Sequence, residues 1–408
     1  MDPIKAIMIG AGQRGNAYAI HAHNKPDDLL FVGVAEPHET RRNDFASKYN
    51  IDAENIHLTW EDVFMREKWA DVVMICTPDN LHYEPIMAAI ELGYDVLLEK
   101  PIAPSEQECA AVAKAAAEKG VKVVVCHVMR YSPFCMTIKD IVESGEIGEI
   151  KTIVHNENVG NVHHSHSFVR GNWANKAKSS PMILQKCCHD MDILQWIIDK
   201  QCLRLSSFGH LSYFKEANAP VGSLSRCTDG CTVDCPYDTR KLYLKGSEWF
   251  RSVAVGHYQA TDDEVLQVLQ TGPYGRCVYR CDNDVVDHQV VSMEFEDEVT
   301  VIFSMSSLTP DTSRSIKIMG TQGQIKAHSS MKSIIVSNFN TGESREIETV
   351  AAGGHGGGDT GIMNAFCAYI RGEDVKNISE ISISAQNHLM CFAAETSRLN
   401  NGAIIELA

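Results

Sequence analysis

The first 130 residues alternate short apolar runs with segments of helical pattern. Five runs occur: IKAIMIG from residue 4, LLFVGVA from 29, DVVMIC from 71, DVLLE from 95 and VKVVVCHV from 121. Short runs rich in β-branched residues and separated by helices are typical of strands buried on both faces of a parallel sheet. The pattern predicts an α/β fold that begins with a doubly wound parallel sheet over residues 1–130.

The rest of the chain has a different period. At 408 residues the chain exceeds the size of one hydrophobic core, so further domains are expected. Val291, Met293 and Phe295 alternate with polar residues, and the alternation resumes at Val299. This pattern predicts a second domain over residues 131–408 with an open, mainly antiparallel sheet covered by helices on one face. Residues 214–285 fit neither pattern and indicate a cysteine-rich insertion.

The turn after the first run reads GAGQRG and places Gly10, Gly12 and Gly15 in a GxGxxG pattern before a helix. Glycines at these positions allow a tight turn and backbone approach to a pyrophosphate at the helix N-terminus. Glu36 ends the second run, where a carboxylate accepts hydrogen bonds from an adenosine ribose. The turn therefore predicts a Rossmann dinucleotide site. The charge of Glu36 favours NAD over NADP, and only the nearby Arg41 and Arg42 weaken that preference.

The composition excludes several classes of protein. Lys and Arg number 37 against 53 Asp and Glu, and the formal charge of −16 argues against nucleic-acid and anionic-lipid partners. No apolar run approaches the roughly 18 residues of a membrane span. Met1 leads almost directly into the first strand, which leaves no room for a secretion signal. The spacing of the 14 cysteines is that of reduced thiols and not of a disulfide framework, so we expect a cytoplasmic protein.

Several landmarks together resemble the family of glucose-fructose oxidoreductase, inositol dehydrogenase and the MocA proteins (Gfo/Idh/MocA). They are GAGQRG at 10, TPDNLH at 77, EKP at 99, HDMD at 189 and GTQG at 320. The resemblance implies a Rossmann domain, an α/β substrate domain and oxidoreductase chemistry on sugars or cyclitols, often in a homo-oligomer. The implied cofactor contacts, beside the glycines and Glu36, are Gln13, Arg14, Thr77, Pro78, His82, Glu99 and Lys100.

Lys100 follows the fourth apolar run, and ligands of open α/β sheets bind outside the carboxyl ends of the strands. Removing a hydride from a secondary alcohol requires withdrawal of the hydroxyl proton. A lysine can polarise that oxygen or relay its proton. The family's EKP segment is matched letter for letter, so Lys100 is predicted to be catalytic.

A single amphipathic helix is expected around residues 182–199, with Gln185, His189 and Asp192 on one face. His189 is suited to accept a proton near neutral pH. The family pattern has Asp where this chain has Gln185, and a neutral amide cannot hold an imidazolium by charge. We assign Gln185 and His189 to catalysis, and expect further substrate contacts from Arg130, Trp173, Lys186, Asp192 and His355.

Two other histidine groups stand out. His163 and His164, in VHHSHSF, are interpreted as solvated residues of a loop over the pocket. His355, in GGHGGGD, resembles the glycine-His-glycine loop of the NAD-dependent glycosidases of the superfamily, the N-acetylgalactosaminidases among them. This similarity keeps open a redox-neutral reaction, in which a hydroxyl is oxidised, the glycosidic bond is eliminated and the carbonyl is reduced back.

Cys227, Cys231 and Cys235 recur at every fourth residue, and Cys277 and Cys281 follow. Four thiolates would form a closed zinc site with a structural role, with Cys281 favoured over Cys277 as the fourth ligand. Free thiols are the equal alternative. We expect a zinc site to pin an insertion too poor in apolar periodicity to fold by burial alone.

The leading hypothesis is an NAD-dependent oxidoreductase that transfers a hydride to or from a secondary hydroxyl of a sugar, glycoside or cyclitol. The alternatives are the redox-neutral glycosidase and a cofactor-binding sensor without chemistry. The expected partner is a small carbohydrate, with neither nucleic acid nor membrane.

Overall fold

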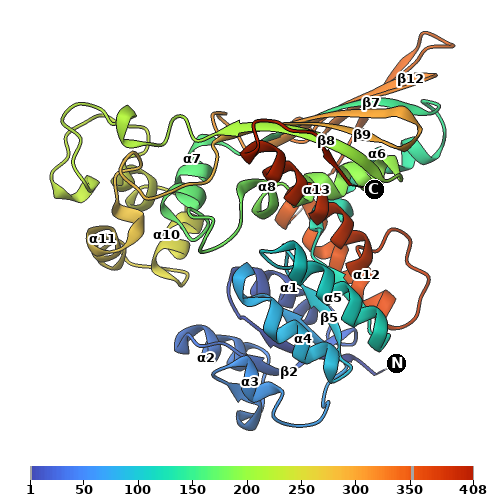
Figure 1. Cartoon of the computed structure of the whole chain (residues 1–408). Coiled ribbons are helices and arrows are strands. Elements are labelled where there is room, and N and C mark those ends of the chain that lie inside the picture. Colours follow the sequence, from blue (N-terminus) through green and yellow to red (C-terminus); the bar gives the residue numbers. More distant parts are fainter. Residues whose placement is uncertain (1, 351–352, 408) are drawn as a thin grey trace.

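The computed structural model describes residues 2–350 and 353–407. Figure 1 shows an N-terminal layer of helices and strands beneath a broad second sheet, with a group of helices to one side. No helix in the described ranges is both long and apolar enough to cross a membrane.

The first sheet contains six strands in the order β3-β2-β1-β4-β5-β6, and all its pairs are parallel. Helices cover both faces, so strands such as VVMI at 72–75 are buried throughout. The expected doubly wound sheet is confirmed. Its elements are β1 Ile4–Ile9, α1 Gln13–Asn24, β2 Leu29–Ala35, α2 Glu39–Lys48, β3 Ile56–His57, α3 Trp60–Val63, β4 Val72–Ile75, α4 Tyr83–Glu91, β5 Asp95–Leu98, α5 Glu106–Lys119 and β6 Val123–Val125.

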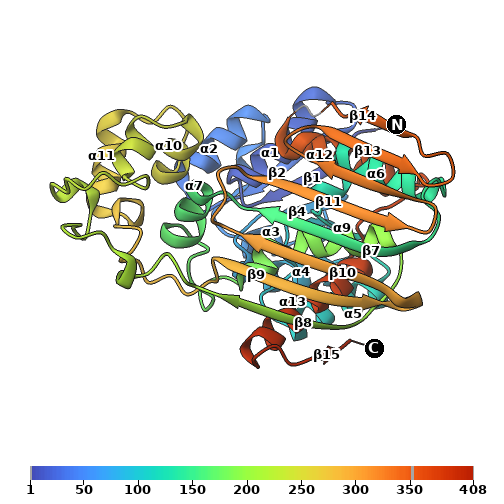
Figure 2. The same cartoon turned by 90° about the horizontal axis from the view of Figure 1, so that it is seen from above.

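The second sheet contains nine strands in the order β14-β13-β12-β11-β7-β10-β9-β8-β15. Its pairs are antiparallel except for β10 and β7, so the expected mainly antiparallel sheet is confirmed. Figure 2 shows the sheet with its helices gathered beneath one face. The strands are β7 Ile150–Asn158, β8 Cys202–His210, β9 His288–Phe295, β10 Val299–Ser306, β11 Ser313–Gly320, β12 Gly323–His328, β13 Ser333–Asn338, β14 Ser344–Glu348 and β15 Ile405–Glu406. The helices packed in this core are α6 Pro133–Glu143, α8 Met182–Gln185, α9 Cys188–Ile198 and α13 Ile381–Leu399.

The helix expected over 182–199 is interrupted, which corrects the sequence interpretation. α8 ends at Gln185, and α9 begins at Cys188 after a turn at Lys186 and Cys187. Every residue of both helices is buried, because the sheet, α6 and α13 enclose them. The amphipathic interpretation was therefore wrong. Because both helices are enclosed on all sides, they have no solvent-exposed polar face, and the sequence pattern could not show whether the helix is continuous.

The segment between β8 and β9 has helices but no strand among its residues, and the structure describes all of them. Helices α10 Glu248–Val255 and α11 Asp262–Thr271 pack around Tyr243 in an apolar cluster, and Phe214 lies in a second one. The insertion thus buries apolar side chains of its own, contrary to the expectation that burial alone could not fold it. It lies beside the first domain (Figure 2), where Arg41 Nε donates to the Gly256 carbonyl oxygen across 3.2 Å.

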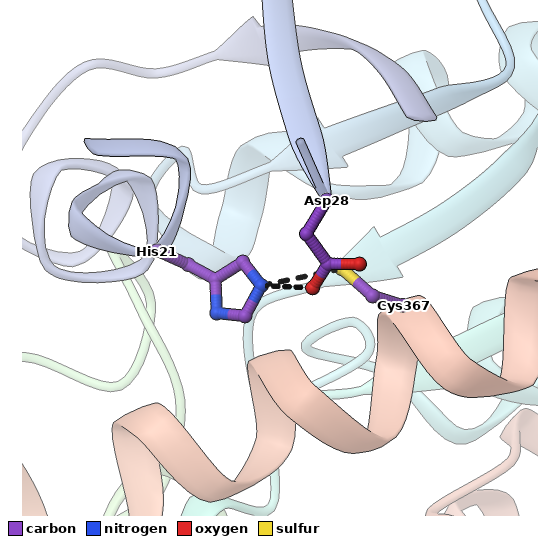
Figure 3. A group of neighbouring side chains, drawn as sticks. All are labelled: His21, Asp28 and Cys367. Carbon is purple, nitrogen blue, oxygen red and sulfur yellow. Dashed lines mark hydrogen bonds and ion pairs between the residues drawn. The ribbon is translucent and has the colours of Figure 1, made fainter. Parts of the chain in front are cut away.

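Helix α12 Gly358–Ile370 returns to the first domain and packs its apolar side against α1. At the far end of α1, His21 Nε2 lies 2.6 Å from Asp28 Oδ2 and 3.7 Å from Cys367 Sγ on α12 (Figure 3). These three residues form the only group in residues 2–350 and 353–407 whose His, Cys and carboxylate atoms lie close enough to hold a metal. Arg371 also pairs with Asp28, so its carboxylate is already neutralised and the group serves to join α1, β2 and α12.

Candidate active site

The glycine turn between β1 and α1 has the geometry that a dinucleotide requires. Gly10 has φ +89° and lies so close to Cys76 that a Cβ would come within 2.8 Å of its backbone. A Cβ on Gly15 would lie 2.3 Å from the Gly10 carbonyl oxygen. Gly12, the N-cap of α1, faces open space and carries no side-chain cap. The N-terminus of α1, with Gln13 as its first residue, is therefore accessible to an anionic group.

Glu36 stands at the end of β2 beside this turn and is 5% exposed. Its carboxylate accepts hydrogen bonds from the backbone N–H of Ala11 at 2.9 Å and of His38 at 3.0 Å. Arg42 donates to the backbone carbonyl of Glu36, and Arg41 to that of Gly256. Both arginines thus have backbone partners, while Glu36 holds the glycine turn at the edge where a ribose would lie.

The TPDNLH and EKP segments meet at the carboxyl ends of β4 and β5. His82 is fully buried, and its ring nitrogens lie 2.8 Å from the Thr77 carbonyl oxygen and 2.7 Å from that of Pro101. It therefore joins the two segments, and both its nitrogens are engaged by the protein, while Pro78 follows Thr77 within the first segment. Asp79 accepts hydrogen bonds from the hydroxyls of Ser179 and Ser180, which ties this edge to the second domain.

Lys100 crosses from the first domain to the second. Its Nζ donates to the backbone carbonyl oxygen of Gln185 across 2.6 Å. In a continuous helix this carbonyl would accept from the N–H four residues on, so the turn between α8 and α9 makes the oxygen available. The Gln185 side chain is itself buried.

His189, near the start of α9, belongs to a row of four histidines. Its ring centroid lies 5.8 Å from that of His127 and 6.2 Å from that of His355, and His127 lies 5.7 Å from His388. Burial is the largest cause that lowers the pKa of His189, followed by the charge of Lys100 and the neighbouring histidines. The ring is therefore neutral at neutral pH and able to accept a proton.

His127 and His388 were not found from the sequence. His127 lies two residues after β6, as Lys100 lies two residues after β5, so the rule that selected Lys100 would also have selected it. Burial lowers the pKa of His127 to about 4. His388 lies on α13 and accepts a hydrogen bond from the backbone N–H of Ile102, a contact 286 residues apart that no local pattern could reveal.

Arg14 links the glycine turn to the EKP segment and to the glycine-rich loop of His355. It pairs with Glu99 at 2.8 Å and with Asp359 at 2.7 Å. Burial alone would raise the pKa of Glu99, but Arg14 and Lys100 bring it below its usual value. His355, with φ 49°, places Nδ1 2.9 Å from Asp359 Oδ1. A continuous charged network therefore runs from the turn to the face of His189.

Three other predicted substrate residues are engaged by the protein. Arg130 and Asp192, 1% and 0% exposed, form a two-pronged ion pair with distances of 2.5 and 3.0 Å. Lys186 lies 3.2 Å from Glu157, whose carboxylate also pairs with Arg314. These charged groups are thus paired within the protein.

The VHHSHSF segment is helical and is buried from His164 onward, so the interpretation of His164 as solvated was wrong, while His163 is half-buried. His164 is stacked between Phe168 and Phe214, and burial lowers its pKa to about 4. His166 stacks on Tyr274 of the insertion, and burial lowers its pKa to about 3. The segment consists of α7 Asn161–His164 and the π-helical turn after it. Aromatic residues of the insertion, which are distant in sequence, enclose it.

A hollow opens between the glycine turn and the insertion. Its wall includes Gln13 of the turn, Trp173, and Trp249 of α10, which is 39% exposed. His163 lies 5.9 Å from Trp249, centroid to centroid. The insertion thus supplies an aromatic wall to the cleft that contains the cofactor turn.

The insertion's cysteines gather around a different cavity. Cys227, Cys231, Cys235 and Cys277 line it, whereas Cys281 does not and instead donates to the Cys277 carbonyl oxygen. Among the described residues, no three of these sulfur atoms lie within 4.8 Å of one another. The predicted set with Cys281 is therefore not assembled around this cavity.

The fold and the site define a two-domain, dinucleotide-binding protein of the oxidoreductase class. Residues 4–127 match the oxidoreductase family with NAD-binding Rossmann fold, and residues 135–326 match the GFO/IDH/MocA C-terminal domain. The chain belongs to the GFO/IDH/MocA family, as the sequence motifs predicted.

Relatives and solved structures agree with this assignment. YteT of Bacillus subtilis is 25% identical over 73% of this chain and 72% of its own length. The scyllo-inositol 2-dehydrogenase (NADP(+)) IolW of Bacillus subtilis is 31% identical over 37% of this chain and 41% of its own length. The structure of levoglucosan dehydrogenase in complex with NADH and L-sorbose has a TM-score of 0.72 at 18% identity, and the similarity covers all of both chains.

Proposed function

We propose that this protein is an NAD-dependent oxidoreductase that transfers a hydride between the nicotinamide and a secondary hydroxyl of a sugar, glycoside or cyclitol. The observation that carries the proposal is the approach of Lys100 to the second domain, four residues from the neutral His189. The family membership and the cyclitol dehydrogenase IolW support the same class of substrate.

The residues present fit the cofactor. The open space at Gly12 and the uncapped N-terminus of α1 would hold the pyrophosphate, and Glu36 would accept hydrogen bonds from the adenosine ribose. NAD supplies a hydride acceptor and NADH a hydride donor. We propose a preference for NAD, because the carboxylate of Glu36 would repel a 2′-phosphate and both nearby arginines have backbone partners. The relative IolW is named as an NADP(+) enzyme, so the preference of this protein for NAD needs a direct test.

The chain's own residues would manage the proton. Lys100 Nζ would donate to the substrate oxygen in place of the Gln185 carbonyl and stabilise the charge that develops there. His189, uncharged in its buried position, would accept the hydroxyl proton. We assign a positioning role to the ion pair of Arg130 and Asp192, which fixes α9 against the turn Val128–Tyr131 after β6.

A second candidate is the redox-neutral cleavage of a glycoside. It is favoured by the position of His355, whose ring centroid lies 6.2 Å from that of His189 and so gives the site a second imidazole. Such a group could act on the leaving oxygen while Lys100 and His189 act on the hydroxyl. The third hypothesis, a sensor without chemistry, requires only the cofactor turn.

We also propose a cytoplasmic homo-oligomer. None of the 14 cysteines, all of which the structure describes, is paired in a disulfide, which is usual in a reducing compartment. Apolar side chains on neighbouring strands of the second sheet, Phe208, Val290 and Ile302, are 54%, 46% and 51% exposed. An exposed apolar sheet face of this kind is a site for association between copies.

One experiment separates the three candidates. The purified protein is incubated with NAD and a panel of sugars, cyclitols and p-nitrophenyl glycosides, while nicotinamide absorbance and nitrophenol release are recorded. A dehydrogenase produces NADH in proportion to substrate consumed, whereas a redox-neutral glycosidase releases nitrophenol without net NADH. Cofactor binding without either signal across the panel would favour the sensor.

A further inference from the structure

Four cysteines of the insertion face one small cavity, far from the glycine turn in sequence. Cys227, Cys231 and Cys235 come from one loop and Cys277 from a second, and the cavity between them has a volume of about 20 Å³. That is room for one water-sized sphere and therefore for one metal ion.

Backbone contacts hold the two loops together. The N–H of Cys277 donates to the Ser225 carbonyl oxygen across 2.8 Å, and Arg226 and Arg276 form an antiparallel bridge. Arg240 donates to the Cys231 carbonyl oxygen across 2.8 Å. The approach of the two cysteine-bearing loops is thus fixed by the backbone.

The wall of the cavity carries donors that have no partner among residues 2–350 and 353–407. Arg170 is 3% exposed, and its Nη1 is buried without an acceptor. Ser223 Oγ is also buried without a partner. The backbone N–H of Tyr237 already donates to Cys235 Sγ across 3.4 Å. Buried donors without acceptors are costly, and here they line the same cavity as sulfur atoms, which become strong acceptors once deprotonated.

We propose that Cys227, Cys231, Cys235 and Cys277 bind one zinc ion as thiolates in a closed, structural site. Four thiolates and Zn²⁺ leave two negative charges, and Arg170 on the same wall offsets one of them, whereas Arg240 on that wall is ion-paired with Asp238 at 2.7 Å. A tetrahedral site with Zn–S bonds of about 2.3 Å needs sulfurs about 3.8 Å apart, so the wider spacing noted above must contract around the ion. Four protein ligands leave no open position for water, which assigns the zinc no part in the chemistry.

The site would stabilise the wall of the substrate cleft. Arg170 ends the helical turn Ser165–Arg170, whose His166 and Ser167 line the hollow with Trp249. Holding the cysteine loops therefore fixes the base of the insertion that carries this aromatic wall. The inference stands whether or not the protein is an oxidoreductase, because metal content is measured without substrate.

The test uses the full chain expressed with added zinc and purified without chelator, with zinc measured by mass spectrometry. We expect about one zinc per chain, and below about a tenth of that in Cys227→Ser, Cys231→Ser, Cys235→Ser and Cys277→Ser. Cys281→Ser, beside the cavity, and Cys367→Ala, in the group with His21, should keep the metal. A zinc-free native chain, or loss of zinc in either control, would overturn the assignment.

A second measurement covers variants that fail to fold. In the native protein, the reaction of the thiols with dithionitrobenzoate is followed before and after a strong chelator is added. We expect about four further cysteines to react once zinc is removed, and protease cleavage to begin within residues 214–285. A chelator that changes neither the number of reactive thiols nor the cleavage pattern would contradict the proposal.

Discussion

Lys100 reaches across the boundary between the two sheets and donates to the backbone carbonyl oxygen of Gln185 at 2.6 Å. The contact depends on the break between α8 and α9, since a continuous helix would occupy that oxygen. Position 185 is where the family pattern has an aspartate. In this chain Lys100 therefore contacts a neutral backbone carbonyl, and position 185 supplies no carboxylate to pair with it. The ammonium group remains available to a substrate oxygen.

Replacing Lys100 with Ala should lower turnover by about two to four orders of magnitude, because the group that stabilises the developing oxyanion is lost. Affinity for NAD should change little, since the glycine turn and Glu36 hold the cofactor. Lys114→Ala, at an exposed position on α5, is the matched control. Steady-state kinetics and a fluorescence titration with NADH measure both effects, and wild-type turnover in the Lys100 variant would remove it from the mechanism.

The pH profile should report His189 in its neutral form. Burial and the nearby charge of Lys100 lower its pKa, so the ring stays unprotonated below the usual value of about 6.5. The acid limb of kcat/KM should therefore lie below pH 6.5. His189→Ala should lose about two to four orders of magnitude in turnover and also lose this limb. A limb that persists in the variant would assign it to another group.

Gln185→Asp should move that limb to higher pH. A carboxylate four residues before His189 adds a negative charge that favours the imidazolium form, so the pKa of His189 should rise. Gln185→Met keeps the size of the native side chain and adds no charge, so it should leave the acid limb of kcat/KM in place. The comparison is made on kcat/KM between pH 5 and 8, and identical profiles for the two variants would mean that position 185 does not couple to His189.

Glu36→Gln should narrow the preference for NAD over NADP, by about tenfold, since the amide lacks the charge that would repel a 2′-phosphate. The remaining amide oxygen can still accept from the backbone N–H of Ala11 or His38. Glu36→Ala removes the hydrogen bonds to both backbone N–H groups and should also weaken the binding of both cofactors. Binding is measured by calorimetry, and equal affinity of the native protein for both cofactors would contradict the preference.

Local patterns predicted what depends on local physics. The parallel sheet follows from short β-branched runs, and the glycine turn from three residues whose Cβ atoms would clash or block a ligand, as Gly10 and Gly15 demonstrate. The alternation from Val291 to Met305 likewise predicted two neighbouring antiparallel strands with one buried face. Glu36 and Lys100, which follow β2 and β5, were selected as candidate site residues by the same local reasoning.

The features that the sequence did not reveal depend on distant partners. The break at Lys186 needs the surrounding helices and sheet, and the burial of His164 needs Phe214 from the insertion. His388 joins the histidine row only because α13 returns to the EKP segment. Similarly, Cys277 faces the cysteine cavity because two loops bridge at Arg226 and Arg276, which spacing along the chain cannot express.

The buried histidines should make the folded state sensitive to mild acid. Burial lowers the pKa of His127 and His164 to about 4, whereas an unfolded histidine takes up its proton near pH 6.5. Below pH 6.5 the unfolded chain therefore binds more protons than the folded one, and stability falls as the pH drops. Each such histidine should lower the free energy of unfolding by about 2 kcal/mol at pH 5 relative to pH 7.

His164→Phe isolates one of these groups. Neither ring nitrogen of His164 has a hydrogen-bond partner in the described part of the chain, and the ring already stacks between Phe168 and Phe214. The substitution should therefore reduce the loss of stability between pH 7 and pH 5 by about 2 kcal/mol. Urea unfolding at both pH values measures the change, with His23→Ala on the exposed side of α1 as the control. A loss as large as that of the native protein would mean that His164 is protonated when folded, and with it that the insertion does not close over this segment in solution.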